Sequence, residues 1–391
     1  MGPLEGITVL DLTRVLSGPY CTMLLADMGA RVIKVEQPGK GDDTRAWGPP
    51  FVNGESAYFM SINRNKESVT LDFKRPEGRA VLDRLVARAD VLVENFRPGT
   101  LTKLGLGYEA LAAAHPHLVY CSVSGFGQTG PRSREPGYDA VIQAEGGLMS
   151  ITGPGDGPPY RLGVAIADVV SGMFAAYGVA MALFARERTG RGQQVDLAML
   201  DAVAALLTYQ AGNFFATGTP PGRLGNRHPS IVPYEVFAAS DGDFVLAVGN
   251  DELWKKFCGV AGVAPDDRFA TNRQRVSGYA ELRPIVARAL AAQPRAYWIE
   301  RLTAAGVPCG SVRDLGEVFG DPQLAARDMI VAMEHPAAGL VRQLGVPVKL
   351  SDTGGTVRTP PPTLGQHTDT VLRDLGLTGD AIAELRRGRV I

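Results

Sequence analysis

Asp168 is the residue whose type and sequence context point most directly to chemistry. A loop rich in glycine and proline (153–163) precedes it, and a stretch that is apolar nearly all round (169–184) follows it. This stretch predicts a buried helix with Asp168 at its start or within its first turn. There the first N–H groups and the helix dipole favour the ionised carboxylate, and a buried carboxylate that stays ionised can act as a covalent nucleophile.

Helix capping is the other interpretation of Asp168. Aspartate is among the best N-cap residues, because its carboxylate accepts hydrogen bonds from unpaired N–H groups of the first turn. The spacing alone therefore does not distinguish a nucleophile from a cap.

Cationic side chains follow two predicted strands in the N-terminal half of the chain. Lys74 follows the strand 68–73, Arg97 follows the strand 91–96, and Lys103 lies six residues beyond Arg97. Ligands of open α/β sheets bind at the carboxyl ends of the strands, and cations placed there suit phosphate groups. Each of these side chains, taken alone, can equally be a solvated surface charge.

Strands alternate with helices through the first half of the chain, which predicts a doubly wound α/β domain with a parallel sheet. The predicted strands are 7–12, 31–36, 68–73, 91–96, 118–124 and a segment within 188–199, and the predicted helices include 17–28, 77–89, 108–114 and 200–212.

A second, smaller domain is predicted after a connection rich in glycine, proline and asparagine (213–230). Residues 234–249 contain two apolar runs around an Asp-Gly turn, which indicates a hairpin. Helices near 251–260, 279–292 and 295–305 accompany it. We therefore predict a discontinuous large domain (1–212 and 325–391), a linker (213–230) and a small α+β domain (231–324).

The composition limits the partners and the compartment. A net charge of −1 gives no electrostatic reason to expect nucleic acid or an anionic membrane as a partner. The four cysteines are scattered without the spacing of a metal site, so we expect no metal and a reducing, cytoplasmic environment. No signal peptide is expected, and the apolar run after Asp168 is shorter than the roughly 20 residues of a membrane span.

The segment 125–130 (GFGQTG) matches the dinucleotide-binding pattern G-x-G-x-x-G and follows a predicted strand. That fingerprint requires a helix that opens on its third glycine. The next residues, 131–136 (PRSREP), cannot supply the apolar face of such a helix. We therefore do not expect a nicotinamide or flavin site.

Three strings carry a resemblance to a known family: Gly137-Tyr138-Asp139, Ala167-Asp168 and 188–193 (RTGRGQ). Together they resemble the class III coenzyme A transferases, the group of formyl-CoA transferase and carnitine CoA transferase. The resemblance implies that Asp168 is the nucleophile. It also implies a large Rossmann-like domain, a small domain and an interlocked homodimer. Coenzyme A would be a substrate, with no permanently bound cofactor.

The resemblance also implies a set of coenzyme-binding positions. They are Leu16, Ser17, Leu71, Asp72, Phe73, Lys74, Asn95, Phe96, Arg97, Lys103, Tyr138 and Asp139. Two positions depart from formyl-CoA transferase, because Leu16 stands in place of its Gln and Gln37 in place of its Arg. Asp139 can either share the work of Asp168 or cap the helix that follows it.

The activity implied by the resemblance is transfer of coenzyme A between carboxylic acids, through an aspartyl anhydride and an aspartyl-CoA thioester. Segment 225–237 is more similar to dicarboxylate-specific members, so we expect succinyl-CoA as donor and a dicarboxylic acceptor. Both intermediates hydrolyse, so the site needs a lid. The candidate is 222–230, where Arg227 or His228 could meet an acceptor, although a plain linker is the alternative.

Two other functions remain open. A 2-methylacyl-CoA racemase shares the family fold, but racemases have His at the position of Tyr138, and tyrosine with a pKa near 10 is a poor base at neutral pH. The second alternative is an acyl-CoA-binding protein without turnover, against which an intact Asp168 argues.

Overall fold

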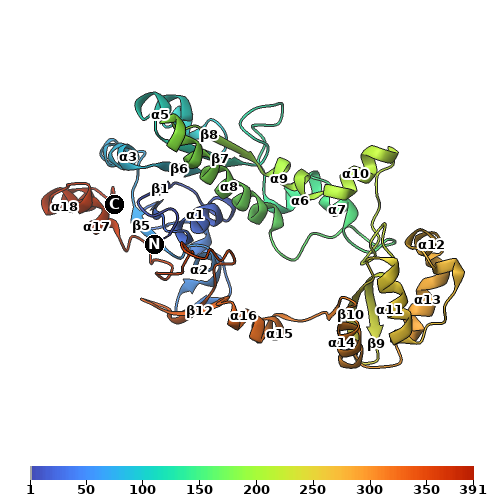
Figure 1. The fold of residues 1–391 in the computed structure, drawn as a ribbon. Helices are drawn as coiled ribbons and strands as arrows, with labels where there is room; N and C mark the ends of the chain where they lie inside the picture. Colours follow the sequence, from blue (N-terminus) through green and yellow to red (C-terminus); the bar gives the residue numbers. More distant parts are fainter. Residues whose placement is uncertain (1) are drawn as a thin grey trace. The chain divides into compact units, whose positions relative to one another are not determined.

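The computed structural model describes residues 2–391 and divides the chain into two compact units, shown as a ribbon in Figure 1. Unit 1 comprises 1–148, 161–212 and 322–391, and unit 2 comprises 149–160 and 213–321. Three segments differ from the predicted boundaries, because 149–160 and the expected linker 213–230 belong to unit 2 and residues 322–324 belong to unit 1. The Arg223 guanidinium donates to the carbonyl oxygens of Pro154 (3.2 Å) and Gly157 (2.7 Å), so the two loops fold against each other.

Unit 1 is built on a six-stranded sheet in the order β5-β2-β1-β6-β7-β8. All its neighbouring strands are parallel, as predicted. The strands are β1 Thr8–Asp11, β2 Arg31–Glu36, β5 Lys66–Thr70, β6 Val91–Glu94, β7 Val119–Ser124 and β8 Gln194–Ala198. β5 begins two residues earlier and ends three residues earlier than the predicted strand 68–73. It ends earlier because the chain turns at Asp72, whose carboxylate accepts the N–H of Lys74 (3.2 Å).

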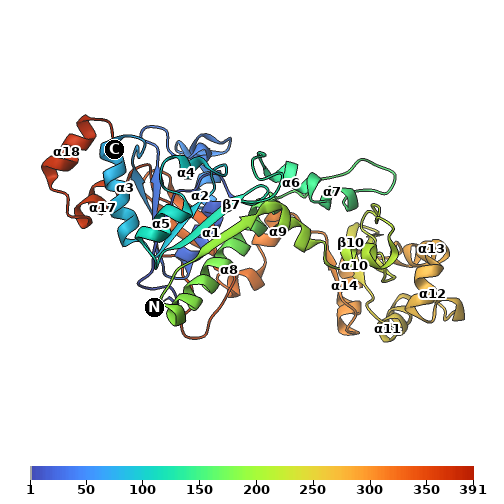
Figure 2. The same cartoon turned by 90° about the horizontal axis from the view of Figure 1, so that it is seen from above.

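Successive residues of the central strand β1 face opposite sides of the sheet, so each face carries its own apolar core. Leu10 belongs to one core and Val9 to the other. On the Leu10 face lie α3 Pro76–Arg88, α5 Tyr108–Ala114, α17 Thr368–Asp374 and α18 Gly379–Arg387, the last two beside α3 in both ribbon views (Figures 1 and 2). On the Val9 face lie α1 Ser17–Asp27 and α8 Ile166–Thr189.

Helix α8 is 24 residues long and differs from the sequence-based expectation. It continues past the apolar run 169–184, and by length and composition alone it is long and apolar enough to cross a membrane. Its first turns pack closely on α1, because a Cβ at Gly172 would lie 2.7 Å from the carbonyl oxygen of Ser17. The opposite side of α8 exposes apolar side chains such as Met173 and Tyr177.

The remaining elements of unit 1 surround these layers. They are η1 Asp43–Ala46, β3 Phe51–Val52, β4 Glu55–Ser56, α2 Ala57–Ser61, α4 Thr100–Lys103, α6 Asp139–Glu145, α9 Met199–Leu206, α16 Pro322–Ala326, β12 Ile330–His335 and β13 Gly339–Leu344. Two helices contain a boundary between the units, α7 Leu148–Ile151 and α10 Thr208–Thr217.

Unit 2 has a three-stranded antiparallel sheet in the order β11-β10-β9. The predicted hairpin is present as β9 Tyr234–Ala239 and β10 Gly242–Ala247, and β11 is Cys309–Ser311. The helices are α11 Asp251–Ala261, η2 Asp267–Phe269, α12 Asn272–Ser277, α13 Tyr279–Leu290, α14 Arg295–Ala304 and α15 Leu315–Phe319. Its core contains Phe237, Phe244, Trp254 and Trp298.

Candidate active site

Two adjoining cavities lie at the carboxyl ends of the strands in unit 1. The first, about 300 Å³, is lined by the segment Leu71–Lys74 after β5, by Phe96 after β6 and by residues that follow β1 and β2. The second, about 170 Å³, is lined by Ser17, Asn95, Arg97, Tyr138 and Asp168, among others. Both cavities include Arg14, Asp43 and Phe96 in their walls. The structure therefore brings most of the predicted site residues to one edge of the sheet.

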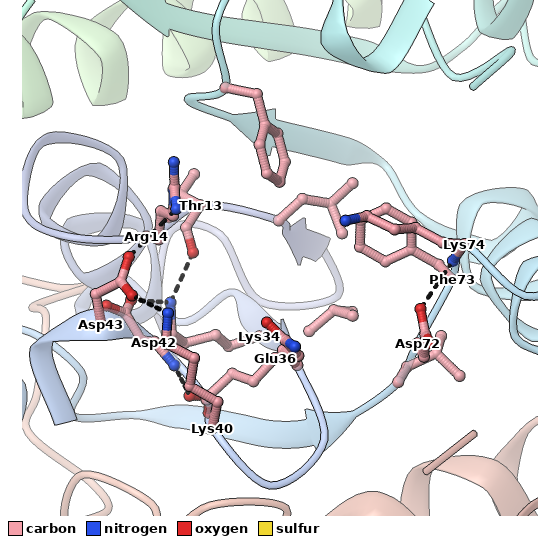
Figure 3. A pocket seen from close by; sticks show the side chains of 16 residues that line it. Thr13, Arg14, Lys34, Glu36, Lys40, Asp42, Asp43, Asp72, Phe73 and Lys74 are labelled. Carbon is pink, nitrogen blue, oxygen red and sulfur yellow. Dashed lines mark hydrogen bonds and ion pairs between the residues drawn. The ribbon is translucent and has the colours of Figure 1, made fainter. Parts of the chain in front are cut away.

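The first cavity has cations on two of its sides. Figure 3 shows Phe73 and Lys74 on the opposite side from Arg14 and Lys40. Separated cations beside an aromatic ring suit a ligand that carries several phosphates and a flat base. Leu71 also lines this cavity, but it is only 1% exposed and its side chain belongs to the core.

Three predicted coenzyme-binding residues line neither cavity: Leu16, Lys103 and Asp139. Leu16 is the buried N-cap of α1, and Lys103 is an exposed residue at the end of α4. Asn95 does line the second cavity, but both ends of its carboxamide hold the backbone of Arg14, at 2.9 Å from N and 2.7 Å from O. These two hydrogen bonds connect the end of β6 to the segment after β1.

Asp168 is the third residue of α8, whose N-cap is Ala165, so it does not cap its own helix. Its carboxyl faces the hydroxyl and the backbone N–H of Ser17, the first residue of α1. Gly172, one turn later, permits this close packing of α8 on α1. The carboxyl is thus held at the start of a second helix, in the wall of a cavity.

The ionisation of Asp168 differs from the sequence-based expectation. Its pKa is raised to about 7, chiefly by burial and secondly by the charge of Asp139, and the hydrogen bonds from Ser17 only partly offset these two effects. Helix N–H groups favour the anion, but removal of the carboxylate from water outweighs them here. The carboxyl therefore holds its proton to a much higher pH than an exposed aspartate does.

Asp139 caps a helix, but not the one that sequence spacing suggested. Tyr138 is the N-cap of α6, and Asp139 is its first residue. The Oδ1 atom of Asp139 accepts the backbone N–H of Ala167 at 2.8 Å, and its Oδ2 atom accepts Nε2 of Gln143 at 2.8 Å. Asp139 therefore supplies, from α6, an acceptor for an N–H in the first turn of α8.

The first glycine of the 125–130 segment, Gly125, serves chain packing together with Gly137. A Cβ at Gly125 would lie 2.8 Å from Cα of Gly137, and a Cβ at Gly137 would lie 2.6 Å from Cα of Gly125. These glycines let the end of β7 touch the segment that leads into α6. Residues 131–134 form turns where the dinucleotide fingerprint requires a helix.

Tyr58, on α2, lines neither cavity but lies close enough to the site to interact with its carboxyls, and sequence reasoning missed it. Its pKa is raised to about 12, chiefly by burial and then by the negative charges of Asp168 and Asp139. Tyr58 therefore stays protonated and can donate a hydrogen bond near these carboxyls. Its ring meets that of Trp47 edge-on, with centroids 5.2 Å apart, and Trp47 lines the second cavity. Only long-range packing brings the irregular segment 38–65 here, so no local sequence signal existed.

The predicted lid segment 222–230 lies in unit 2. The Arg227 guanidinium stacks on the ring of Tyr279 at 3.6 Å, and the rings of His228 and Tyr234 lie 5.3 Å apart. These contacts are all internal to unit 2, and the lid role stays a prediction.

The cysteines of the chain are free thiols. Cys21 and Cys121 are buried, and Cys258 and Cys309 are half-buried. Burial raises the pKa of Cys258 to about 11, which makes that thiol a poor nucleophile at neutral pH. Among residues 2–391, no group of three or more His, Cys, Asp or Glu side chains is arranged to hold a metal ion.

The chain was compared with protein families, with curated proteins and with solved structures, and it matches all three. Residues 4–368 match the model of "CoA-transferase family III". The chain is 44% identical to succinyl-CoA:glutarate CoA-transferase of Mus musculus over 96% of this chain and 87% of the relative. It is 46% identical to acetyl-CoA:oxalate CoA-transferase of Acetobacter aceti over 90% of each protein. The solved structure of a CAIB/BAIF family protein from Brucella suis is 42% identical, with a TM-score of 0.85 over 96% of this chain and 99% of that one.

Proposed function

The chain belongs to CoA-transferase family III and is a CoA-transferase, and we propose that it moves coenzyme A from succinyl-CoA to a dicarboxylic acid with Asp168 as nucleophile. The observation that carries the proposal is the Asp168 carboxyl in the wall of the second cavity, next to a first cavity whose walls carry both cations and carboxylates, with Arg14 and Lys40 paired to Asp43 and Lys74 on the other side. The acceptor class is supported by the two relatives, since glutarate and oxalate, in their names, are both dicarboxylates.

The proposed reaction needs one carboxylate and the thiol of the substrate. An oxygen of ionised Asp168 attacks the thioester carbon, the C–S bond breaks, and CoA leaves as a thiolate from the resulting aspartyl–succinyl anhydride. The thiolate attacks the Asp168 carbonyl carbon, succinate leaves, and an aspartyl-CoA thioester forms. The acceptor carboxylate displaces the thiolate to give a second anhydride. Attack of the thiolate on the acceptor carbonyl then yields the new acyl-CoA and restores the Asp168 carboxylate.

The residues of the two cavities have distinct parts in this proposal. Lys74, Lys40 and Arg14 would bind the phosphates in the first cavity, which places the thioester end of the substrate toward Asp168 in the second. A thiolate held beside the anhydride reacts as an intramolecular nucleophile, and such proximity can be worth about 7–11 kcal/mol. The hydroxyl and N–H of Ser17 favour the ionised carboxylate at the start and end of each cycle.

The direct test is to incubate the protein with succinyl-CoA and one acid at a time, and to identify acyl-CoA products by mass spectrometry. We expect new acyl-CoA with glutarate and other dicarboxylates, and much slower transfer to monocarboxylates of equal length. Deuterium entry at the α-carbon without acyl exchange would instead identify a racemase. Absence of any acyl exchange with the whole panel, in protein that binds CoA, would contradict the proposal.

We also propose that two copies of the chain form a homodimer through the exposed apolar side of α8. That side carries Met173, Phe174, Tyr177, Met181 and Phe184. Exposed apolar patches of this kind mark interaction surfaces, and a second copy presents the same patch. Light scattering should give twice the 41.6 kDa of one chain, and Tyr177→Lys, at a side chain that is 63% exposed, should shift the mass toward the monomer. A monomeric wild-type protein at micromolar concentration would contradict this proposal.

A further inference from the structure

Gln143, in the middle of α6, is completely buried although its side chain is a polar carboxamide. A buried amide without hydrogen-bond partners destabilises the folded state, so both of its ends need partners. Its Nε2 donates to Oδ2 of Asp139 at 2.8 Å, and its Oε1 accepts the backbone N–H of Leu162 at 3.0 Å. The two partners fix the orientation of the amide, because the flipped amide would place oxygen against carboxylate.

These bonds belong to a longer chain that ends beside Asp168. The N–H of Leu162, in the glycine- and proline-rich loop, binds Gln143, which binds Asp139, which accepts the N–H of Ala167 at 2.8 Å. Ala167 directly precedes Asp168, and the N-cap residue of α8, Ala165, makes no side-chain capping bond. The loop and the first turn of α8 are thus tied to α6 through one carboxamide and one carboxylate.

From this arrangement we infer that Gln143 is a positioning residue for acyl transfer, which holds the Asp139 carboxylate and, through it, the backbone that carries Asp168. The inference rests on the proposed role of Asp168. Gln143 lines neither of the two cavities, so it acts through Asp139 and the loop rather than on the substrate. Misplacement of a reacting group by about 1 Å can lower a rate by about a hundredfold.

The uncharged amide is suited to this position because it donates to one group and accepts from another at every pH. Asp139 on α6, Asp168 on α8 and Tyr58 on α2 interact electrostatically. The cavity of Asp168 is also lined by Arg14, Asp43, Arg97, Glu135 and Tyr138. A carboxyl in place of the amide can donate to Asp139 only while it is protonated. Once ionised, it would oppose the Asp139 carboxylate and disturb the first turn of α8.

The test compares Gln143→Met, which has similar size but makes neither bond, with Gln143→Glu. We expect Gln143→Met to lower kcat by at least about tenfold at every pH, with KM for the acyl-CoA changed less than about threefold. For Gln143→Glu, the ratio of its rate to the wild-type rate should be near one at about pH 6 and fall at least tenfold by about pH 9. Glu145→Gln, on the same helix at an exposed ion pair with Arg132, is the matched control and should keep the wild-type profile.

Hydrogen exchange separates this inference from the proposed function. In both variants the amides of 161–168 should exchange faster than in the wild type, and in Gln143→Glu the difference should grow with pH. A wild-type protein that transfers CoA between no acids overturns the proposed function, while the exchange data still test the hydrogen-bond chain. Wild-type rate and protection in Gln143→Met, or a rate ratio of Gln143→Glu that does not fall with pH, would overturn the role of Gln143. If Gln143→Met fails to fold, the inference is tested by the pH dependence of the ratio between the Gln143→Glu rate and the wild-type rate.

Discussion

Asp168→Asn is expected to lower CoA transfer by at least about 10⁴-fold, because the amide has the size of the carboxyl but cannot attack a thioester carbon. The affinity for CoA should change less than about threefold, since the proposed phosphate-binding cations lie in the first cavity, which Asp168 does not line. The rate would be measured with succinyl-CoA and glutarate, and CoA binding by calorimetry.

The control for this substitution is Asp156→Asn, which changes an exposed aspartate of the glycine- and proline-rich loop (153–163) that precedes α8. It should transfer CoA at the wild-type rate. Transfer by Asp168→Asn within about tenfold of the wild-type rate would remove the nucleophile from the proposed reaction, whatever the other residues do.

The raised pKa of Asp168 also predicts how the activity depends on pH. Only the ionised form is a nucleophile, so kcat/KM of the wild type should fall as the pH drops below about 7.

The folded protein also holds the proton of Asp168 more tightly than the unfolded chain does, because an aspartate in the unfolded chain has a pKa near 3.8. The raised pKa therefore contributes to the free energy of unfolding in full below about pH 4, and this contribution is lost as the pH rises through about 7. Asp168→Asn should therefore raise the unfolding free energy at about pH 8.5, by about 1–3 kcal/mol, and much less at pH 5.

The parallel sheet and the edge that carries the cavities could be predicted from the sequence. Apolar β-branched runs alternate with helical segments, and residues such as Lys74 and Arg97 follow those runs directly. In an open parallel sheet, residues after successive strands necessarily meet at one edge. Local pattern and chain connectivity were therefore sufficient for this part of the site.

The electrostatics of the site could not be predicted, because they depend on contacts between distant segments. The pKa of Asp168 depends on burial beneath other elements and on Asp139, which a separate helix carries. The sequence left two roles open for Asp139, a share in the work of Asp168 or the cap of the helix that follows it, but the packing of α6 beside α8 turns its carboxylate toward Ala167. Sequence spacing reports neighbours along one helix and not the neighbours that packing supplies.

A buried ionic cluster joins two strands of the sheet in unit 1. Lys66 and Asp11, on β5 and β1, are fully buried, and Nζ of Lys66 lies 3.2 Å from Oδ2 of Asp11. Nζ also donates to Oδ1 of Asn63 (2.9 Å) and to the carbonyl of Pro19 (2.8 Å) in the first turn of α1. Burial acts to raise the pKa of Asp11, but Lys66 and Lys34 outweigh it and lower the pKa to about 2.

Lys66→Met should lower the unfolding free energy by about 3–5 kcal/mol, because it leaves a buried carboxylate and two acceptors without their cation. For a unit of this size the melting temperature should fall by roughly 5–9 °C, as measured by calorimetry. Lys255→Met is the matched control, since the exposed Lys255–Glu252 pair at 2.7 Å should contribute less than about 1 kcal/mol.

A double-mutant cycle shows whether the loss comes from the unpaired charge. Asp11→Asn removes the carboxylate. The double variant should therefore lose less unfolding free energy than the two single variants combined, with a coupling of at least about 1 kcal/mol.

The contact of Lys66 with Pro19 also connects this cluster to the start of α1, where Ser17 faces Asp168. Lys66→Met should therefore raise the pH of the acid limb of kcat/KM, because a looser Ser17 favours the Asp168 anion less. Additive losses together with an unmoved acid limb would show that the cluster contributes packing alone.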